Sequence, residues 1–207
     1  DPGMPSPPSG APRASSPVTI LAVHGIREVV AGDDVAGLVV DAVVRDGIRL
    51  MAGDCLVISS KVASKALGLT WSGSKEDAVA AGTVRVVAER WADGRATQVV
   101  ESVAGPVMAA AGVDASNTGP SAGLLLLPED PDAVAAQVRS DVLALLDLAP
   151  STPFAVVLSD TAGRPWRGGL TDFALGSAGL RVLEGLRGGT DHDGRPRTVT
   201  MRAVAAA

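Results

Sequence analysis

Aromatic side chains are scarce in this chain, and their scarcity restricts how a core can be built. The 207 residues include three Trp, two Phe and no Tyr, although 46% of the chain is hydrophobic. Valine, leucine and alanine must therefore fill most of the interior. Such small side chains let backbones approach one another closely, which agrees with the presence of 24 glycines. The length suits one large domain or two small ones.

Charge and cysteine content narrow the functional classes. A net charge of -5 argues against nucleic acid as a main partner, because phosphate neutralisation needs a basic surface. The single cysteine excludes an internal disulfide, and a cytoplasmic location is the expectation. No apolar run reaches the ~20 residues of a membrane helix. Residues 1–17 are rich in proline and are expected to form a disordered leader before a domain over 18–207.

Hydrophobic periodicity predicts a mixture of helices and strands. One helix is expected between a cap at Asp33 or Asp34 and Gly47, and another begins at a cap at Asp132. Further helices are expected over 60–67, 76–91 and 172–183, and strands over 18–23, 55–59, 97–102, 124–127, 154–158 and 198–204. Because no strict β-α repeat is present, the pattern favours an α+β or irregular α/β fold with mixed sheets and flanking helices. Gly68–Lys75 has serine where a phosphate-binding loop has lysine after its second glycine, and no Gly-x-Gly-x-x-Gly stands between a predicted strand and a helix. Neither a P-loop nor a Rossmann fold is therefore expected.

The predicted helix over 60–67 presents two lysines on one face. Lys61 and Lys65 are four residues apart, as are Ser60 and Ser64. Two ammonium groups at this spacing repel each other by about 0.2–0.5 kcal/mol, and a bound polyanion would reverse that penalty. The alternative is a pair of solvated lysines with no ligand.

Carboxylates in two other segments suit a hard cation. Asp160 and Thr161 directly follow an apolar strand, and an aspartate with a threonine hydroxyl or carbonyl oxygen is a suitable ligand set for Mg²⁺ or Mn²⁺. Asp114, Ser116 and Asn117 lie in a loop flanked by glycine. A capping aspartate at the first position and an Asx-turn at the second are the simpler alternatives.

Two arginines flank Trp166 shortly after this aspartate. Arg164 and Arg167 are candidate substrate contacts, because a guanidinium group binds carboxylate or phosphate through two hydrogen bonds. Surface arginines on either side of a packed tryptophan remain the alternative.

Five ordered stretches of the sequence are similar to one known family. They are His24-Gly-Ile-Arg-Glu with Ala31–Asp34, Val57–Gly68, Ala110–Asn117, Leu125–Ala133, and Leu158–Asp172 with Gly176–Leu180. Together they resemble the coenzyme F420 gamma-glutamyl ligases, both the stand-alone archaeal enzymes and the N-terminal domain of the two-domain actinobacterial enzyme. The resemblance extends from about Val18 to Val204.

The resemblance implies GTP-dependent ligation of L-glutamate to the deazaflavin precursor of coenzyme F420, through an acyl phosphate. It also implies a homodimer with an unusual α/β fold. Asp160 and Lys65 would be catalytic. By the same comparison, the metal ligands for Mg²⁺ or Mn²⁺ would be Asp114, Asp160 and Thr161, and the GTP contacts would be Ile26, Arg27, Glu28, Val29, Ser60, Lys61, Lys65 and Asn117.

Two features depart from the family pattern. Arg27 stands where family members usually have proline, and the sequence ends before a C-terminal segment that touches nucleotide and metal in the family. A ligase-like module that binds nucleotide or deazaflavin without catalysis is therefore the competing hypothesis, followed by a ligase for other acids and amines.

Overall fold

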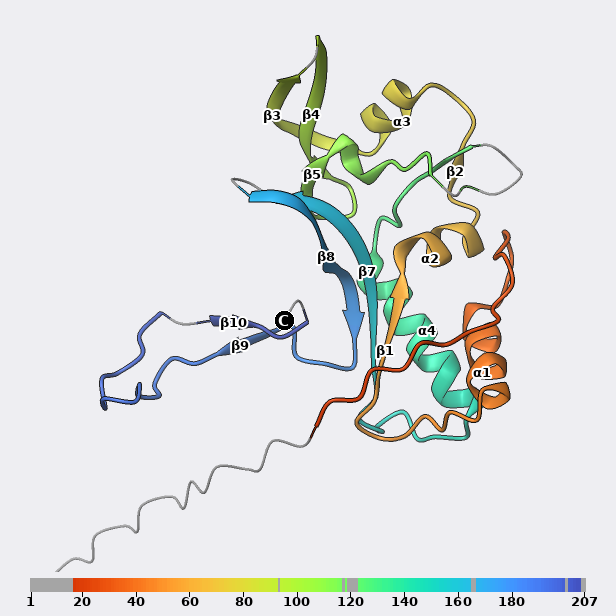
Figure 1. Cartoon of the computed structure of the whole chain (residues 1–207), viewed down its shortest axis with the longest axis vertical. Coiled ribbons are helices and arrows are strands. Elements are labelled where there is room, and N and C mark those ends of the chain that lie inside the picture. The colour runs from red at the N-terminus through yellow and green to blue at the C-terminus, as the bar shows by residue number, and fades with distance from the viewer. Residues whose placement is uncertain are drawn as a thin grey trace, which may run out of the picture.

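The computed structural model describes residues 17–92, 94–116, 118, 123–164, 167–199 and 201–205. The predicted α+β class is confirmed, with several small sheets and flanking helices. A three-stranded sheet lies at the centre, in the order β1-β7-β8 (Figure 1). Its strands are β1 (Cys55–Ser59), β7 (Ala155–Arg164) and β8 (Arg167–Ala178). Strand β1 runs parallel to β7, whereas β8 runs antiparallel to it.

Three helices cover one face of this sheet (Figure 1). They are α1 (Val35–Arg45), α2 (Ser60–Ala66) and α4 (Pro131–Leu145). The shared core is aliphatic apart from Phe154, as the scarcity of aromatics required. Alternate β1 residues Leu56 and Ile58 enter this core, while Val57 between them is exposed. The sheet therefore has one face packed against helices and one face that is more open.

Capping residues set the limits of the two longer helices. Asp34, one of the two predicted caps, accepts a hydrogen bond from the Gly37 N–H at 3.0 Å, and the chain leaves α1 through Gly47 at a φ of 69°. The predicted cap Asp132 is wrong. Helix α4 begins two residues earlier, with Asp130 as its cap and Pro131 in its first turn.

A second group of elements packs beyond the end of the central sheet (Figure 1). A two-stranded sheet joins β2 to β6, and a three-stranded sheet has the order β3-β4-β5. The element bounds are β2 (Thr70–Trp71), α3 (Lys75–Ala81), β3 (Thr83–Ala92), β4 (Arg95–Ser102), β5 (Val107–Ala109), the 3₁₀ turn η1 (Ala110–Gly112) and β6 (Leu124–Leu125).

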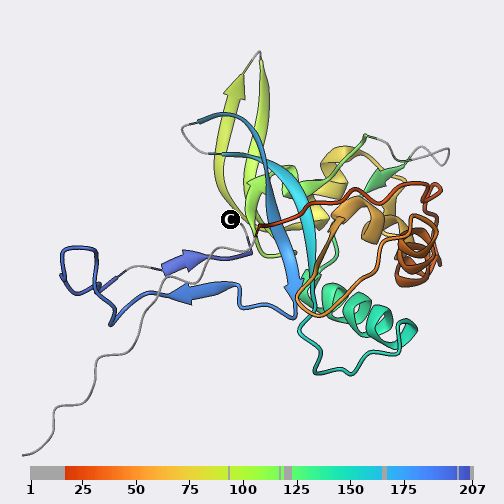
Figure 2. The ribbon, with the colours of Figure 1, turned by 60° about the horizontal axis from the view of Figure 1, so that its bottom comes forward.

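The last two strands form a ribbon that extends away from the rest of the molecule (Figures 1 and 2). Strand β9 (Leu183–Gly185) pairs antiparallel with β10 (Met201–Ala203). The ribbon exposes apolar side chains, among them Leu183 and Val199. It contains only part of the strand predicted over 198–204.

Three predicted elements are wrong. The helix predicted over 76–91 is only α3, which ends at Gly82 before the β-branched strand β3. The helix predicted over 172–183 is mostly β8, because its backbone pairs with β7. Residues 18–23 have no regular structure, and Val18 and Ile20 are exposed. The predicted leader falls outside the described residues, apart from Pro17.

Candidate functional site

Three segments distant in sequence bring their charged side chains together. Lys61 extends from α2, Asp114 follows η1, and Asp160 lies on β7. The Lys61 ammonium is 2.5 Å from an Asp114 carboxylate oxygen and donates a hydrogen bond to the Ser116 hydroxyl at 2.8 Å. The predicted lysine helix and the loop of Asp114 are thus directly joined by an ion pair. The third predicted segment is close enough for the charges of Lys61 and Asp114 to affect Asp160. We call Lys61, Asp114 and Asp160 the charged cluster.

The pKa of Asp114 is set by opposing effects. Burial alone would raise it, but hydrogen bonds from Lys61 and from the Ser116 N–H and hydroxyl outweigh burial and hold the pKa below its usual value. Both Ser116 bonds to the carboxylate are 2.8 Å long. Asp114 is therefore a fixed negative charge at neutral pH.

Asp160 behaves in the opposite way. Burial raises the pKa of Asp160, and the nearby Asp114 charge raises it further. The Thr161 backbone N–H, the Ser60 side chain and Lys61 offset these effects only in part. Ser60 is itself buried, on the face of α2 opposite the solvent. Asp160 is thus a partly desolvated carboxylate near the charge of Asp114. A bound cation would offset the repulsion between the two carboxylates.

Asp160 lies within a strand and not at its end, so the predicted strand end is wrong. Strand β7 continues past Asp160 to Arg164, because β8 pairs with the whole length of β7. Successive side chains of a strand point to opposite faces. The Thr161 hydroxyl accordingly faces away from Asp160 and donates to Asp172 on β8 at 2.5 Å. The Thr161 hydroxyl therefore does not face a cation near Asp160, and the Thr161 carbonyl as a ligand stays a prediction.

Lys65 also has a carboxylate partner, in the loop before α1. Its ammonium pairs with Glu28, and the same loop is fastened by a hydrogen bond from the Gly32 N–H to the Ala66 carbonyl at 2.8 Å. The side chain of Lys65 is mostly covered, whereas that of Glu28 is more than half exposed. Both predicted phosphate-binding lysines therefore form ion pairs within the protein.

Arg27, the departure from the family pattern, stiffens this loop. Its guanidinium group binds both carboxylate oxygens of Asp33, at 2.6 and 2.7 Å. The Arg27 side chain and the Val30 N–H together lower the pKa of Asp33 to about 2. The arginine thus fixes the loop internally and does not point freely toward a ligand.

The remaining predicted contacts are dispersed. In the same loop, Ile26 is partly exposed, whereas Val29 is buried. Arg164 and Arg167 pair across the tip of the β7–β8 hairpin, four residues or roughly 13 Å beyond Asp160. Asn117 lies outside the described residues. The arginines and Asn117 stay predictions.

Asp114 and Asp160 suit a divalent cation that keeps several waters of its own. Among the described residues, no group of three or more His, Cys, Asp or Glu side chains converges as a metal site. The electrostatic strain on Asp160 is the structural feature that fits a cation. Sequence reasoning missed the pairing of Asp33 with Arg27 and of Asp172 with Thr161, because the folded loop and the strand register bring these residues together and no spacing in the chain signals it.

The fold and the charged cluster define an α+β protein in which lysine and carboxylate side chains from distant segments lie together. Residues 77–207 match the family described as F420-0:Gamma-glutamyl ligase. A protein of Halobacterium salinarum named "Coenzyme F420:L-glutamate ligase" is 37% identical over 205 residues, covering 89% of this chain and 76% of the relative. A protein of Haloarcula marismortui with the same name is 36% identical, with the same coverage of both chains. The chain belongs to the F420-0:gamma-glutamyl ligase family.

The helices give one further result. None of those in the described part of the chain is both long enough and apolar enough to span a membrane.

Proposed function

We propose that the protein is a GTP-dependent ligase that joins L-glutamate to the lactyl-phosphate-linked deazaflavin precursor of coenzyme F420. Family membership supports the ligase class. The observation that supports nucleotide use is the convergence of Lys61, Asp114 and Asp160 from three distant segments. Charges of both signs, held close together and partly buried, are what phosphoryl transfer requires of a protein.

The proposed reaction has two steps. A carboxylate oxygen of the precursor attacks the γ-phosphorus of GTP, the bond to the β-phosphate oxygen breaks, and GDP leaves. The resulting acyl phosphate is then attacked at its carbonyl carbon by the glutamate amine. The C–O bond to phosphate breaks, inorganic phosphate leaves, and the amine proton passes to solvent or phosphate. Repetition on the γ-carboxylate would lengthen the chain.

The side chains have separate tasks in this scheme. Lys61 and Lys65 would exchange their carboxylate partners for phosphate oxygens, since each pair is only partly buried. Asp114 and Asp160 would hold Mg²⁺ or Mn²⁺, which when bound neutralises charge on the phosphates. The Ser60 side chain and the Thr161 N–H keep Asp160 in place for this role.

Calorimetry with GDP and Mn²⁺ tests the site. We expect the protein to bind GDP in a Mn²⁺-dependent manner and Asp160→Ala to abolish this binding. Asp41→Ala, an exposed change on α1, is the matched control and should bind normally. Equal binding by the protein and by Asp160→Ala would exclude the proposed site.

A non-catalytic binding module is the second candidate. The pairing of both lysines with the protein's own carboxylates favours it, because such pairs compete with phosphate. Incubation with GTP, glutamate and the precursor separates the two, with the product followed by mass spectrometry. Addition of one glutamate excludes the module, and a panel of other acids and amines tests for a different ligase.

We also propose that the protein forms a homodimer through the β9–β10 ribbon. The ribbon stands apart from the body (Figure 2). The side chains of Leu183 and Met201 in it are exposed. Isolated two-stranded ribbons are marginally stable in water, so a partner surface would stabilise this one. Sedimentation equilibrium should show a dimer that Leu183→Arg dissociates and that Val44→Arg, on an exposed site of α1, leaves intact.

A further inference from the structure

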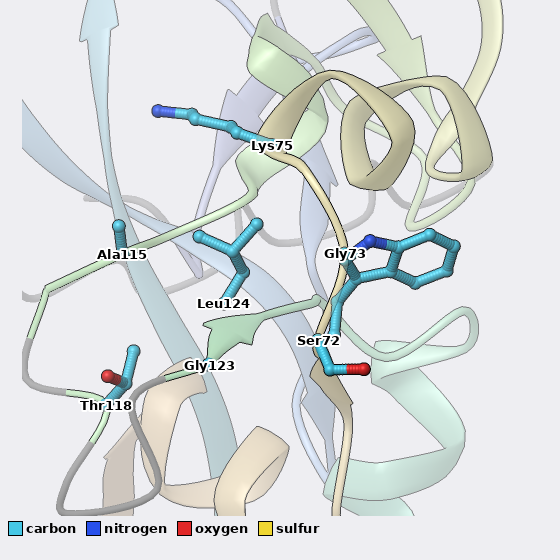
Figure 3. Close-up of a pocket in the computed structure, with 8 residues that line it drawn as sticks. Ser72, Gly73, Lys75, Ala115, Thr118, Gly123 and Leu124 are labelled. Atoms are coloured by element: carbon cyan, nitrogen blue, oxygen red, sulfur yellow. The ribbon is translucent and has the colours of Figure 1, made fainter.

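A hollow of about 350 Å³ lies beside the charged cluster, between the β2–β6 sheet and the start of α3. Figure 3 shows Leu124 in its middle, with Ala115 and Thr118 on one side and Ser72 on the other. Lys75 extends from the start of α3 toward the Ala115 side. The volume is at the lower end of the range of about 300–1,000 Å³ typical of small-molecule sites.

One short segment separates this hollow from the charged cluster. Asp114 pairs with Leu125 through backbone hydrogen bonds of 3.0 and 2.8 Å. Asp114 and Ser116 both direct their side chains to Lys61, whereas Ala115 between them lines the hollow. A molecule in the hollow would therefore lie next to the charged cluster, on the side away from Lys61. Because α2 and the loop around Glu28 surround the lysines, a nucleotide on Lys61 and Lys65 would occupy the other side.

The polar groups of the hollow are mainly donors. Lys75 supplies an ammonium group, and Ser72 and Thr118 supply hydroxyls. No aspartate or glutamate is found among its described lining residues, although acidic residues outnumber basic ones in the chain. The Trp71 indole nitrogen adjoins the same wall and is buried without a hydrogen-bond partner in the described structure. The hollow thus suits an anion, and Leu124 and Ala115 offer apolar contact to a short aliphatic chain.

We propose that this hollow binds the acidic amino acid that the ligase adds, with Lys75 pairing with one of its carboxylates. The assignment rests on the proposed function and locates the second substrate on the opposite side of Asp114 from the nucleotide. In this arrangement only the segment from Asp114 to Ser116 separates the bound amino acid from the charged cluster. The hydroxyls of Ser72 and Thr118 complete the polar contacts, and the aliphatic part lies on Leu124.

Glutamate binding to the whole chain, saturated with GDP and Mn²⁺, tests the proposal by calorimetry. Lys75→Met should weaken binding of L-glutamate about tenfold or more, as expected for loss of a charged hydrogen bond. Lys75→Arg should restore much of it. Ala115→Leu should weaken it by filling the hollow without removing a charge. Arg49→Gln, which removes a surface cation elsewhere, should have no effect.

The affinity for GDP separates failure of the hollow as a glutamate site from failure of the proposed function. All four variants should keep it within about twofold, and circular dichroism should confirm that they are folded. Unchanged glutamate affinity in both Lys75→Met and Ala115→Leu, with nucleotide binding and ligation intact, would overturn the assignment of the hollow alone. Absence of nucleotide binding and ligation in the unchanged protein would overturn the proposed function as well. In steady-state assays, Lys75→Met should raise KM for glutamate and leave KM for GTP unchanged.

Discussion

Replacement of Asp160 by asparagine should stabilise the protein while it abolishes metal-dependent nucleotide binding. Burial and the Asp114 charge disfavour the ionised form of Asp160. Asparagine has nearly the same shape, and its oxygen can still accept hydrogen bonds from Ser60 and from the Thr161 N–H. The substitution therefore removes a costly charge without leaving a cavity.

The size of the gain follows from the half-buried position of this carboxylate. Single stabilising changes, optimisation of charges among them, commonly add about 0.5–2 kcal/mol to the free energy of unfolding. For a chain of this length, that corresponds to a rise of about 1–8 °C in Tm. Asp41→Asn on the exposed side of α1 should stay within about 0.5 kcal/mol of the unchanged protein.

The gain should also depend on pH. Because the pKa of Asp160 is raised on folding, the folded state binds this proton more tightly than the unfolded chain does. The stability that Asp160 contributes is present below the unfolded pKa, about 3.9, and is lost as the pH rises through the folded pKa. Asp160→Asn should thus raise Tm at pH 7.5 and have little effect near pH 4. A fall in Tm at pH 7.5, measured by calorimetry, would refute this account of the carboxylate.

Three other substitutions test separate contacts. Glu28→Gln should raise the affinity for GDP several-fold in calorimetry, because it frees Lys65, and should change stability by no more than about 1 kcal/mol. Gly176→Ala should lower the free energy of unfolding in urea by about 1–3 kcal/mol, since its Cβ would stand 2.4 Å from the Pro131 backbone. Because the pKa of Asp33 is lowered to about 2, the stability from its pair with Arg27 is present above pH ~3.9 and is lost toward pH 2. Asp33→Asn should therefore flatten the acid dependence of urea unfolding in that range.

The sequence predicted the core helices better than the strands around them. Apolar spacing identified the buried face of α1, and a strand predicted over 55–59 is β1 itself. The helix predicted over 172–183 is wrong because long-range pairing with β7 overrides local preference. Gly176 in that stretch packs directly on Pro131, a contact that spacing cannot reveal.

The sequence singled out Lys61, Asp114 and Asp160, which the structure brings together, but it did not predict their pairings. The four-residue spacing correctly placed Lys61 and Lys65 on one helix face, where both are partly covered, and Ser60 and Ser64 lie on the adjacent, buried face. The carboxylate that pairs with each lysine depends on how α2, η1 and the loop before α1 pack together. The direction of the Thr161 hydroxyl depends on which alternate residues of β7 face the helices. Only the pairing of β7 with β8 in the assembled sheet determines this.

In the proposed function, the two lysine pairs would keep like charges available for a polyanion. Lys61 and Lys65 repel each other across one helical turn, and Asp114 and Glu28 offset that repulsion in the free protein. Partly exposed pairs of this kind contribute only about 0–1 kcal/mol each, so a phosphate can replace the carboxylates at little cost. Asp114 released from Lys61 would then be free to hold a cation together with Asp160. Nucleotide and cation should consequently bind with positive coupling, and GDP affinity should rise with Mn²⁺ in the unchanged protein but not in Asp114→Asn.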